Sequence, residues 1–195
     1  MKKLLPPALI TALVVFIWSA VSWMVIPWHQ NTIHNLPEGG KILELIKKSD
    51  LTAGIYHYPG IPEEDTKEAL ENIIQRYENG PVISFMVYLP DGAKWMDPLQ
   101  FITGFIIYFI CAMICAFFIS VSGEYASGFA SKVLIVFLLG LFGVLVGPLS
   151  EWNWWKFPGD FMIVLVVDML ITWLLAGFVL AWRISKSNLK VRNAG

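Results

Sequence analysis

The chain has 195 residues, of which 56% are hydrophobic and 15% are charged, and its mean hydropathy is +0.62. This composition is typical of a membrane protein and unusual for a soluble domain. The formal net charge of −1 argues against nucleic-acid binding, which needs a clustered basic surface. We therefore expect the lipid bilayer as a partner of this chain, and no nucleic acid.

The first apolar segment follows Met1-Lys2-Lys3 and carries no charge from residue 8 to residue 26. A helix of this length spans about 28 Å, close to the thickness of the hydrocarbon core. A cleaved secretory signal peptide is the alternative interpretation. However, the one cleavage-like sequence, Trp18-Ser19-Ala20, places a bulky tryptophan where a small residue is needed. We predict that residues 1–28 hold a retained transmembrane helix with a short cytoplasmic N-terminus.

Three more apolar segments predict transmembrane helices at about 98–121, 131–150 and 160–183. Four spans place both chain ends on the same side of the membrane. The short loop on the opposite side carries Lys156 as its one basic residue. By the positive-inside rule, both termini are cytoplasmic, and the fold is an all-α four-helix membrane bundle. The basic residues on the cytoplasmic side are Lys2, Lys3, Lys132, Arg183, Lys186, Lys190 and Arg192.

Residues 29–97 form the predicted extracytoplasmic (periplasmic) domain between the first two spans. This region, extended to residue 98, contains eleven acidic and six basic residues. A domain this small buries little surface, so we expect it to rest on the bundle or on a partner. Periodicity and turn residues predict a small α/β fold with a helix at 37–48, a strand at 53–58, a helix from Pro62 to Gly80 and a strand at 82–89.

Both helices of this domain are predicted to be amphipathic. Each carries apolar residues at helical spacing, and such a stripe needs a covering surface. The stripes consist of Ile42, Leu45 and Ile46 in the first helix and of Leu70, Ile73, Ile74 and Tyr77 in the second.

Tryptophans gather near the predicted outer boundary of the membrane. Their rings are apolar while their N–H groups need a hydrogen bond, so anchoring at the interface is the simplest explanation. Three tryptophans within residues 152–155 exceed what one boundary needs. The alternative is a platform for a lipid headgroup, a quinone or another subunit. The residues of this interfacial platform are Trp23, Trp28, Trp152, Trp154 and Trp155.

Three short segments of the sequence resemble those of a known family. The Ser-Trp-x-x-x-Pro-Trp-His segment at 22–29, Gly54-Ile55-Tyr56 and the Trp-Asn-Trp-Trp segment at 152–155 resemble an uncharacterised family of bacterial four-span inner-membrane proteins. The resemblance extends over most of the chain, but its motifs are aromatic and not catalytic. It implies a multi-pass protein of the bacterial inner (cytoplasmic) membrane, and it transfers no functional residues.

Asp168 is the one charged residue between Phe161 and Trp182, in the interior of the fourth predicted span. A carboxylate inside a membrane costs roughly 2.5–3.5 kcal/mol on insertion scales, so it should face other helices and find hydrogen-bond partners. Counting depth along the spans predicts Ser19, Tyr108 and Thr172 as its intramembrane polar contacts. We interpret Asp168 as a protonated structural contact. A proton or ion relay and a pairing site for another membrane protein remain alternatives, although no other acidic, basic or histidine side chain occurs in residues 8–26, 98–121, 133–150 or 161–182.

The third predicted span contains Gly143-x-x-x-Gly147, a spacing of small residues that allows another helix to approach closely. The second span contains Cys111 and Cys115, four residues apart on one helical face. Their spacing differs from the C-x-x-C of thiol oxidoreductases, and apolar surroundings disfavour the reactive thiolate. We predict that both cysteines serve packing.

The three histidines could at most form a weak metal site outside the membrane. His29, His34 and His57, with Glu38 or Asp50 as a fourth ligand, supply suitable donor types. The spacing of five between His29 and His34 does not align on a helix. We therefore predict ordinary interfacial or surface histidines, no metal and no cofactor.

Catalytic motifs such as H-E-x-x-H, G-x-S-x-G and a phosphate-binding glycine loop do not occur in the sequence. We therefore expect a non-enzymatic accessory or interaction subunit that acts through its periplasmic domain and Trp-rich loop, with a membrane-protein partner or a second copy of itself. A metal- or quinone-linked redox or envelope-homeostasis protein is the first alternative. A small transporter organised around Asp168 is the second.

Overall fold

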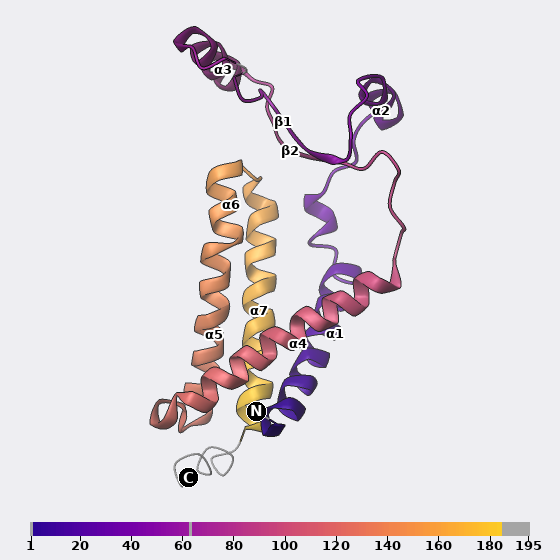
Figure 1. Cartoon of the computed structure of the whole chain (residues 1–195). Helices are drawn as coiled ribbons and strands as arrows, with labels where there is room; N and C mark the ends of the chain where they lie inside the picture. Colours follow the sequence, from indigo (N-terminus) through magenta and orange to yellow (C-terminus); the bar gives the residue numbers. More distant parts are fainter. Residues whose placement is uncertain (1, 63, 185–195) are drawn as a thin grey trace. The chain divides into compact units, whose positions relative to one another are not determined.

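The computed structural model describes residues 2–62 and 64–184 (Figure 1). The basic residues Lys186, Lys190 and Arg192 lie outside the described residues. The chain divides into two compact units. The helical unit comprises described residues within 1–34, 96–152 and 158–195, and the hairpin unit comprises those within 35–95 and 153–157.

Four helices in the described part of the chain are long and apolar enough to cross a membrane. They are α1 (Leu5–Met24), α4 (Pro98–Val121), α5 (Phe129–Val146), which continues into the short α6 (Pro148–Trp155), and α7 (Gly159–Arg183) (Figure 1). Short 3₁₀ turns lie at Lys2–Leu4, Gln30–Thr32 and Gly123–Ala126. The prediction of a helical, multi-pass membrane protein is confirmed at this level.

The ends of these helices follow from local chemistry. The carboxylate of Asp97 accepts a hydrogen bond from the Leu99 N–H at 3.0 Å, and Pro98 follows at the first helical position, so α4 begins where the sequence predicts. The third apolar segment that could cross a membrane runs from Phe129 to Trp155, but it is not one unbroken helix. Instead, α5 stops at Val146, because Gly147 leaves helical geometry, and Pro148 opens α6.

In the helical unit, α1 packs against α4 and α7, while α5 packs mainly against α7 and more narrowly against α4. Small side chains allow these approaches. A Cβ atom on Gly140 would lie 2.3 Å from Cβ of Trp173, and one on Gly177 would lie 3.1 Å from the Val133 carbonyl oxygen. By contrast, nothing lies within 4 Å of a Cβ on Gly143. The close helix approach therefore uses Gly140 and Gly177, and not the predicted Gly143-x-x-x-Gly147 pattern.

Lys132 joins the beginning of α5 to the end of α7. Its side chain is buried, and Nζ donates a hydrogen bond of 2.6 Å to the carbonyl oxygen of Ile184, the C-cap residue of α7. The last carbonyls of a helix lack partners within the helix and carry partial negative charge. Lys132, which is predicted to mark the cytoplasmic side of the membrane, therefore also caps the C-terminal end of α7.

The hairpin unit contains α2 (Gly39–Lys48), β1 (Gly54–Tyr58), α3 (Lys67–Asn79) and β2 (Ile83–Tyr88). The strands pair antiparallel, with Ile55 opposite Val87. The predicted order of helix, strand, helix, strand is observed, but α3 begins at Lys67 and not at Pro62. The reason is Thr66, whose hydroxyl accepts a hydrogen bond from the Ala69 N–H at 3.2 Å and caps the helix there.

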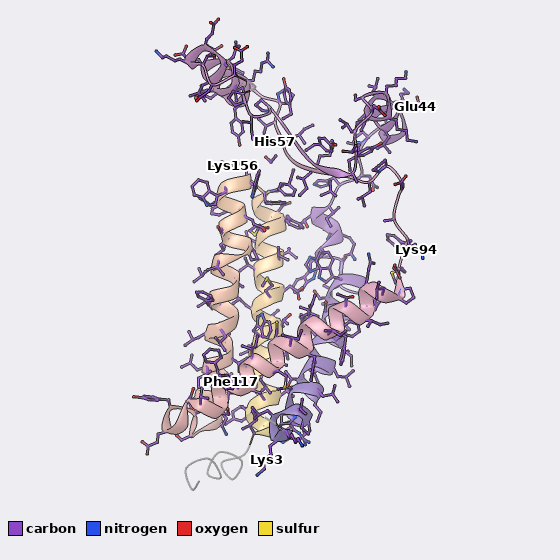
Figure 2. All side chains as sticks on the ribbon, in the orientation of Figure 1. Lys3, Glu44, His57, Lys94, Phe117 and Lys156 are labelled. Carbon is purple, nitrogen blue, oxygen red and sulfur yellow. The ribbon has the colours of Figure 1, made fainter. Side chains whose placement is uncertain are left out.

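The hairpin unit has almost no core of its own. Among its described residues, only Pro59 and Tyr88 are buried. The side chains of α2 and α3 extend from their helices without a covering layer (Figure 2). The predicted stripes form, but they are exposed or half-buried, and Leu45 is 65% exposed.

Candidate functional site

Asp168 lies in α7, nine residues after Gly159 and thus about 13 Å along the helix. The residue is only 6% exposed. The indole Nε1 of Trp18 in α1 donates to Asp168 Oδ1 at 2.9 Å. This bond joins α1 to α7 and satisfies one carboxylate oxygen.

The second carboxylate oxygen faces a histidine from outside the predicted spans. Nε2 of His29 lies 3.2 Å from Asp168 Oδ2, and His29 is 1% exposed. The chain reaches this position because it reverses after α1, where the Pro27 carbonyl accepts a hydrogen bond from the Asn31 N–H at 3.0 Å. His29 thereby returns to the level of the last turns of α1.

Ser22 and Trp28 complete the polar environment of His29. Ser22 Oγ lies 3.2 Å from His29 Nε2 and is fully buried. The indole N–H of Trp28 is shared between the Ser22 carbonyl, at 3.0 Å, and Ser22 Oγ, at 3.1 Å. The segment after α1 is therefore held by hydrogen bonds both to its own helix and to α7.

Aromatic rings enclose the imidazole. The Trp23 ring stacks on His29 with centroids 3.8 Å apart and planes inclined by 7°, and Trp28 meets the imidazole edge-on at 5.7 Å. The Gln30 side-chain amide donates to the Trp23 carbonyl, and Thr32 Oγ1 donates to the His29 carbonyl at 2.9 Å. These contacts exclude water from one side of the pair and fix the rotamer of His29.

The geometry places one proton between His29 and Asp168. Two electron pairs cannot face each other across 3.2 Å, so either Nε2 carries the proton and donates to the carboxylate, or the acid carries it and donates to Nε2. An imidazole that carries protons on both ring nitrogens, facing an ionised Asp168 carboxylate, would give an ion pair, and the indole face of Trp23 would stabilise its cation by a cation–π contact. Nδ1 of His29 is buried and has no hydrogen-bond partner among the described residues.

The partners of Asp168 differ from those that depth counting predicts. Thr172 Oγ1 donates to the backbone carbonyl of Asp168 at 2.9 Å and not to the carboxylate. In the described chain, the carboxylate's hydrogen-bond partners are Trp18 and His29, not Ser19 or Tyr108. Tyr108 packs against the hydrophobic core, and Ser19 is half-buried.

The expectation of a surface position for His29 is corrected by its burial. The sequence places His29 at the start of the predicted extracytoplasmic domain, as an interfacial or surface histidine, and it therefore does not predict a position beside Asp168. A signal was present in the 22–29 segment, because Ser22, Trp28 and His29 supply hydrogen-bonding groups on both sides of Pro27, a residue that ends helices.

The other two histidines are exposed, as predicted. His34 belongs to the helical unit and His57 to the hairpin unit. No group of three or more His, Cys, Asp or Glu residues suited to a metal ion occurs among the described residues. Because Nε2 of His29 already faces Asp168, that nitrogen is not available as a metal ligand. Cys115 is buried in the hydrophobic core of the helical unit, as expected for a packing cysteine.

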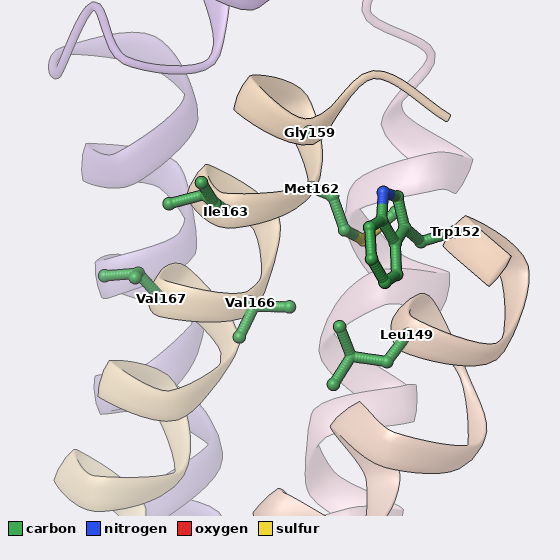
Figure 3. A pocket seen from close by; sticks show the side chains of 7 residues that line it. All are labelled: Leu149, Trp152, Gly159, Met162, Ile163, Val166 and Val167. Carbon is green, nitrogen blue, oxygen red and sulfur yellow. The ribbon is translucent and has the colours of Figure 1, made fainter. Parts of the chain in front are cut away.

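The five platform tryptophans occupy three environments. Trp23 and Trp28 enclose His29. Trp152 lies over an apolar groove between α6 and α7, beside Met162 and Leu149 (Figure 3). Trp154 and Trp155 belong to the hairpin unit, where the Trp155 ring packs edge-on against Phe85 with centroids 5.0 Å apart.

A second candidate site lies within the hairpin unit. It is a pocket of about 240 Å³ between β1, α3, the start of β2 and the end of α6. Its wall includes His57, Tyr58, Tyr77, Ser84, Trp154 and Trp155. Four aromatic side chains thus meet around one opening.

Comparison with protein-family models, with curated proteins and with solved structures gives no match to this chain.

Proposed function

We propose that this protein is a non-enzymatic interaction subunit of the bacterial inner membrane. Its four long helices form a bundle, both termini are cytoplasmic, and the hairpin unit is periplasmic. The basic residues near one set of helix ends, including Lys3, Lys132 and Arg183, support this orientation. The partner is another membrane protein or a second copy of the chain.

The observation that carries this proposal is the uncovered apolar surface of the hairpin unit. Large apolar side chains of α2, β1, α3 and β2 are exposed, among them Leu45, Ile55, Leu70 and Val87. Amphipathic helices gain most of their stability from covering the apolar stripe, and a single strand pair is marginal by itself. Apolar patches of this kind mark sites of association.

The His29–Asp168 pair has a structural role in this proposal. The chain leaves the helical unit soon after His29, and the pair fixes that exit segment to α7. The pair thereby fixes the point at which the chain leaves the helical unit toward the hairpin unit.

Photocrosslinking in membranes tests the proposal. A photoreactive residue at Leu45 or Leu70, on the apolar stripes, should give a discrete product with a second copy or with one other protein. The matched positions Glu44 and Glu71 lie beside the stripes and should give little product. Equal or diffuse labelling from all four positions would count against an interaction surface.

A proton-linked transporter organised around Asp168 is the second candidate. One observation favours it: Asp168 pairs with His29, a second ionisable group. In proteoliposomes, the wild-type protein should then dissipate an imposed pH gradient faster than the Asp168→Asn variant. Ser19→Ala is the control, since the hydrogen-bond partners of the carboxylate are Trp18 and His29. Equal rates for the wild type and Asp168→Asn would exclude this function.

A further inference from the structure

We propose that the aromatic pocket of the hairpin unit binds a quaternary ammonium group, such as that of choline. This inference goes beyond the interaction function and does not depend on it. It concerns the pocket lined by His57, Tyr58, Tyr77, Ser84, Trp154 and Trp155, which lies entirely within the hairpin unit.

The composition of the wall indicates the charge of the ligand. Two tryptophans and two tyrosines line the pocket, and among aromatic rings tryptophan gives the strongest attraction for a cation. Among the residues that the structure describes, neither lysine nor arginine lines the pocket. Residues 35–95 and 153–157 together carry ten acidic and seven basic side chains, so the surrounding field also favours a cation.

Phe85 supports the aromatic wall of the pocket through a ring contact with Trp155. The Trp155 ring packs edge-on against Phe85, at an interplanar angle of 80°, and Phe157 contacts the same phenylalanine with centroids 6.3 Å apart. Phe85 therefore holds the Trp155 ring in place before any ligand arrives, which reduces the entropic cost of binding.

The polar groups of the pocket suit the remainder of such a ligand. His57 and Ser84 can form hydrogen bonds with a hydroxyl group or a phosphate oxygen, while the aromatic rings contact the methylated nitrogen. Free choline and the headgroup of phosphatidylcholine share this chemistry.

The test compares choline with its neutral isostere, in which carbon replaces nitrogen. Both are titrated into the full-length protein in a maltoside detergent and followed by ligand-observed NMR. Saturable binding of choline, with the isostere at least about fivefold weaker, supports a cation–π site. Equal binding of both, or no saturable binding of choline, overturns the proposal.

Variants locate the site. Trp154 is 75% exposed, so Trp154→Leu should leave the fold intact and weaken choline binding about fivefold or more, whereas Trp154→Phe should weaken it less. Trp95→Leu is the matched control, because Trp95 belongs to the same unit, is 92% exposed and does not line the pocket. Equal weakening by Trp95→Leu, or none by Trp154→Leu, contradicts the assignment.

Nanodiscs distinguish the two sources of the ligand. If the headgroup of a lipid occupies the pocket, the apparent affinity for choline should be lower in phosphatidylcholine discs than in phosphatidylglycerol discs. Equal affinity in the two discs identifies a free solute as the ligand. The Trp154→Leu variant should bind choline weakly in both.

Discussion

At the residue scale, the pair of His29 and Asp168 changes how the intramembrane carboxylate is understood. An isolated carboxylate near the middle of a helix would have to be neutral to remain in lipid. Here Trp18 and His29 each contact one oxygen, and Ser22 contacts the histidine in turn. Because Trp18, Asp168, His29 and Ser22 are linked in one chain of hydrogen bonds, the effects of their substitutions on stability should be strongly coupled.

Truncation of His29 should be far more harmful than a conservative change of Asp168. His29→Ala leaves a buried carboxylate with one donor, so we expect a loss of about 3–5 kcal/mol in the free energy of unfolding. Asp168→Asn keeps an acceptor for Trp18 and a donor for His29, so we expect a loss below about 1.5 kcal/mol.

Reversible unfolding in mixed micelles measures these losses, and the His29→Ala/Asp168→Asn double variant completes the cycle. Its loss should be smaller than the sum of the single losses, because no charge is left unpaired. Strictly additive losses would show that the two side chains are not coupled.

Trp18→Phe should separate the hydrogen bond of Trp18 from its packing. The variant keeps an aromatic ring but removes the donor to Asp168 Oδ1, and a hydrogen bond to a charged group contributes about 1.5–3 kcal/mol. Trp182→Phe is the control, since Trp182 is exposed. The same micelle experiment should show a clear loss for Trp18→Phe alone; similar stability of the two variants would contradict the hydrogen bond.

At the element scale, the contact between α5 and α7 depends on glycines that the small-residue spacing did not identify. Gly140 faces Trp173 of α7 and Gly177 faces the backbone of α5, while Gly143 has open space beside it. Which glycine is buried depends on how the helices are rotated about their axes, and the spacing of small residues does not determine that rotation.

Substitution by alanine should destabilise the protein at Gly140 but not at Gly143. Gly140→Ala forces the Trp173 side chain or the helices apart, and we expect a loss of about 1–3 kcal/mol. Gly143→Ala meets nothing within 4 Å and should be neutral or stabilising by up to about 1 kcal/mol, since alanine is the better helix former. Thermal unfolding in detergent compares the two; a destabilised Gly143→Ala variant would restore the original expectation.

At the scale of the whole molecule, the two units differ in how they are stabilised. The core of the helical unit includes residues of all four long helices, such as Val15, Cys115, Val136 and Leu180. The hairpin unit buries only two of its described residues. It therefore needs a covering surface that it does not supply itself.

The isolated segment 35–95 should not fold cooperatively in water. With its apolar stripes exposed, the gain from burial cannot offset the loss of conformational entropy. Circular dichroism should show low helicity and a gradual thermal change. A sharp transition, with a monomeric peptide, would mean that the segment has a core of its own and would weaken the proposed interaction function.

The sequence by itself determined the features that depend on local composition. The four long helices, the start of α4 at Pro98 and the order of elements in the hairpin unit follow from hydropathy, periodicity and capping residues, all of which act over a few turns. Helix α3 begins at Lys67, later than the predicted start at Pro62, because the side chain of Thr66 caps the helix there.

Only the tertiary structure decided which residues meet. His29 and Asp168 are 139 positions apart, and they come together because the chain reverses after α1 and because α1 packs against α7. Depth along each helix is encoded locally, whereas the path of a loop and the rotation of a helix depend on contacts between distant segments. For that physical reason, Asp168 could be recognised from the sequence as a buried polar residue, while its partners could not.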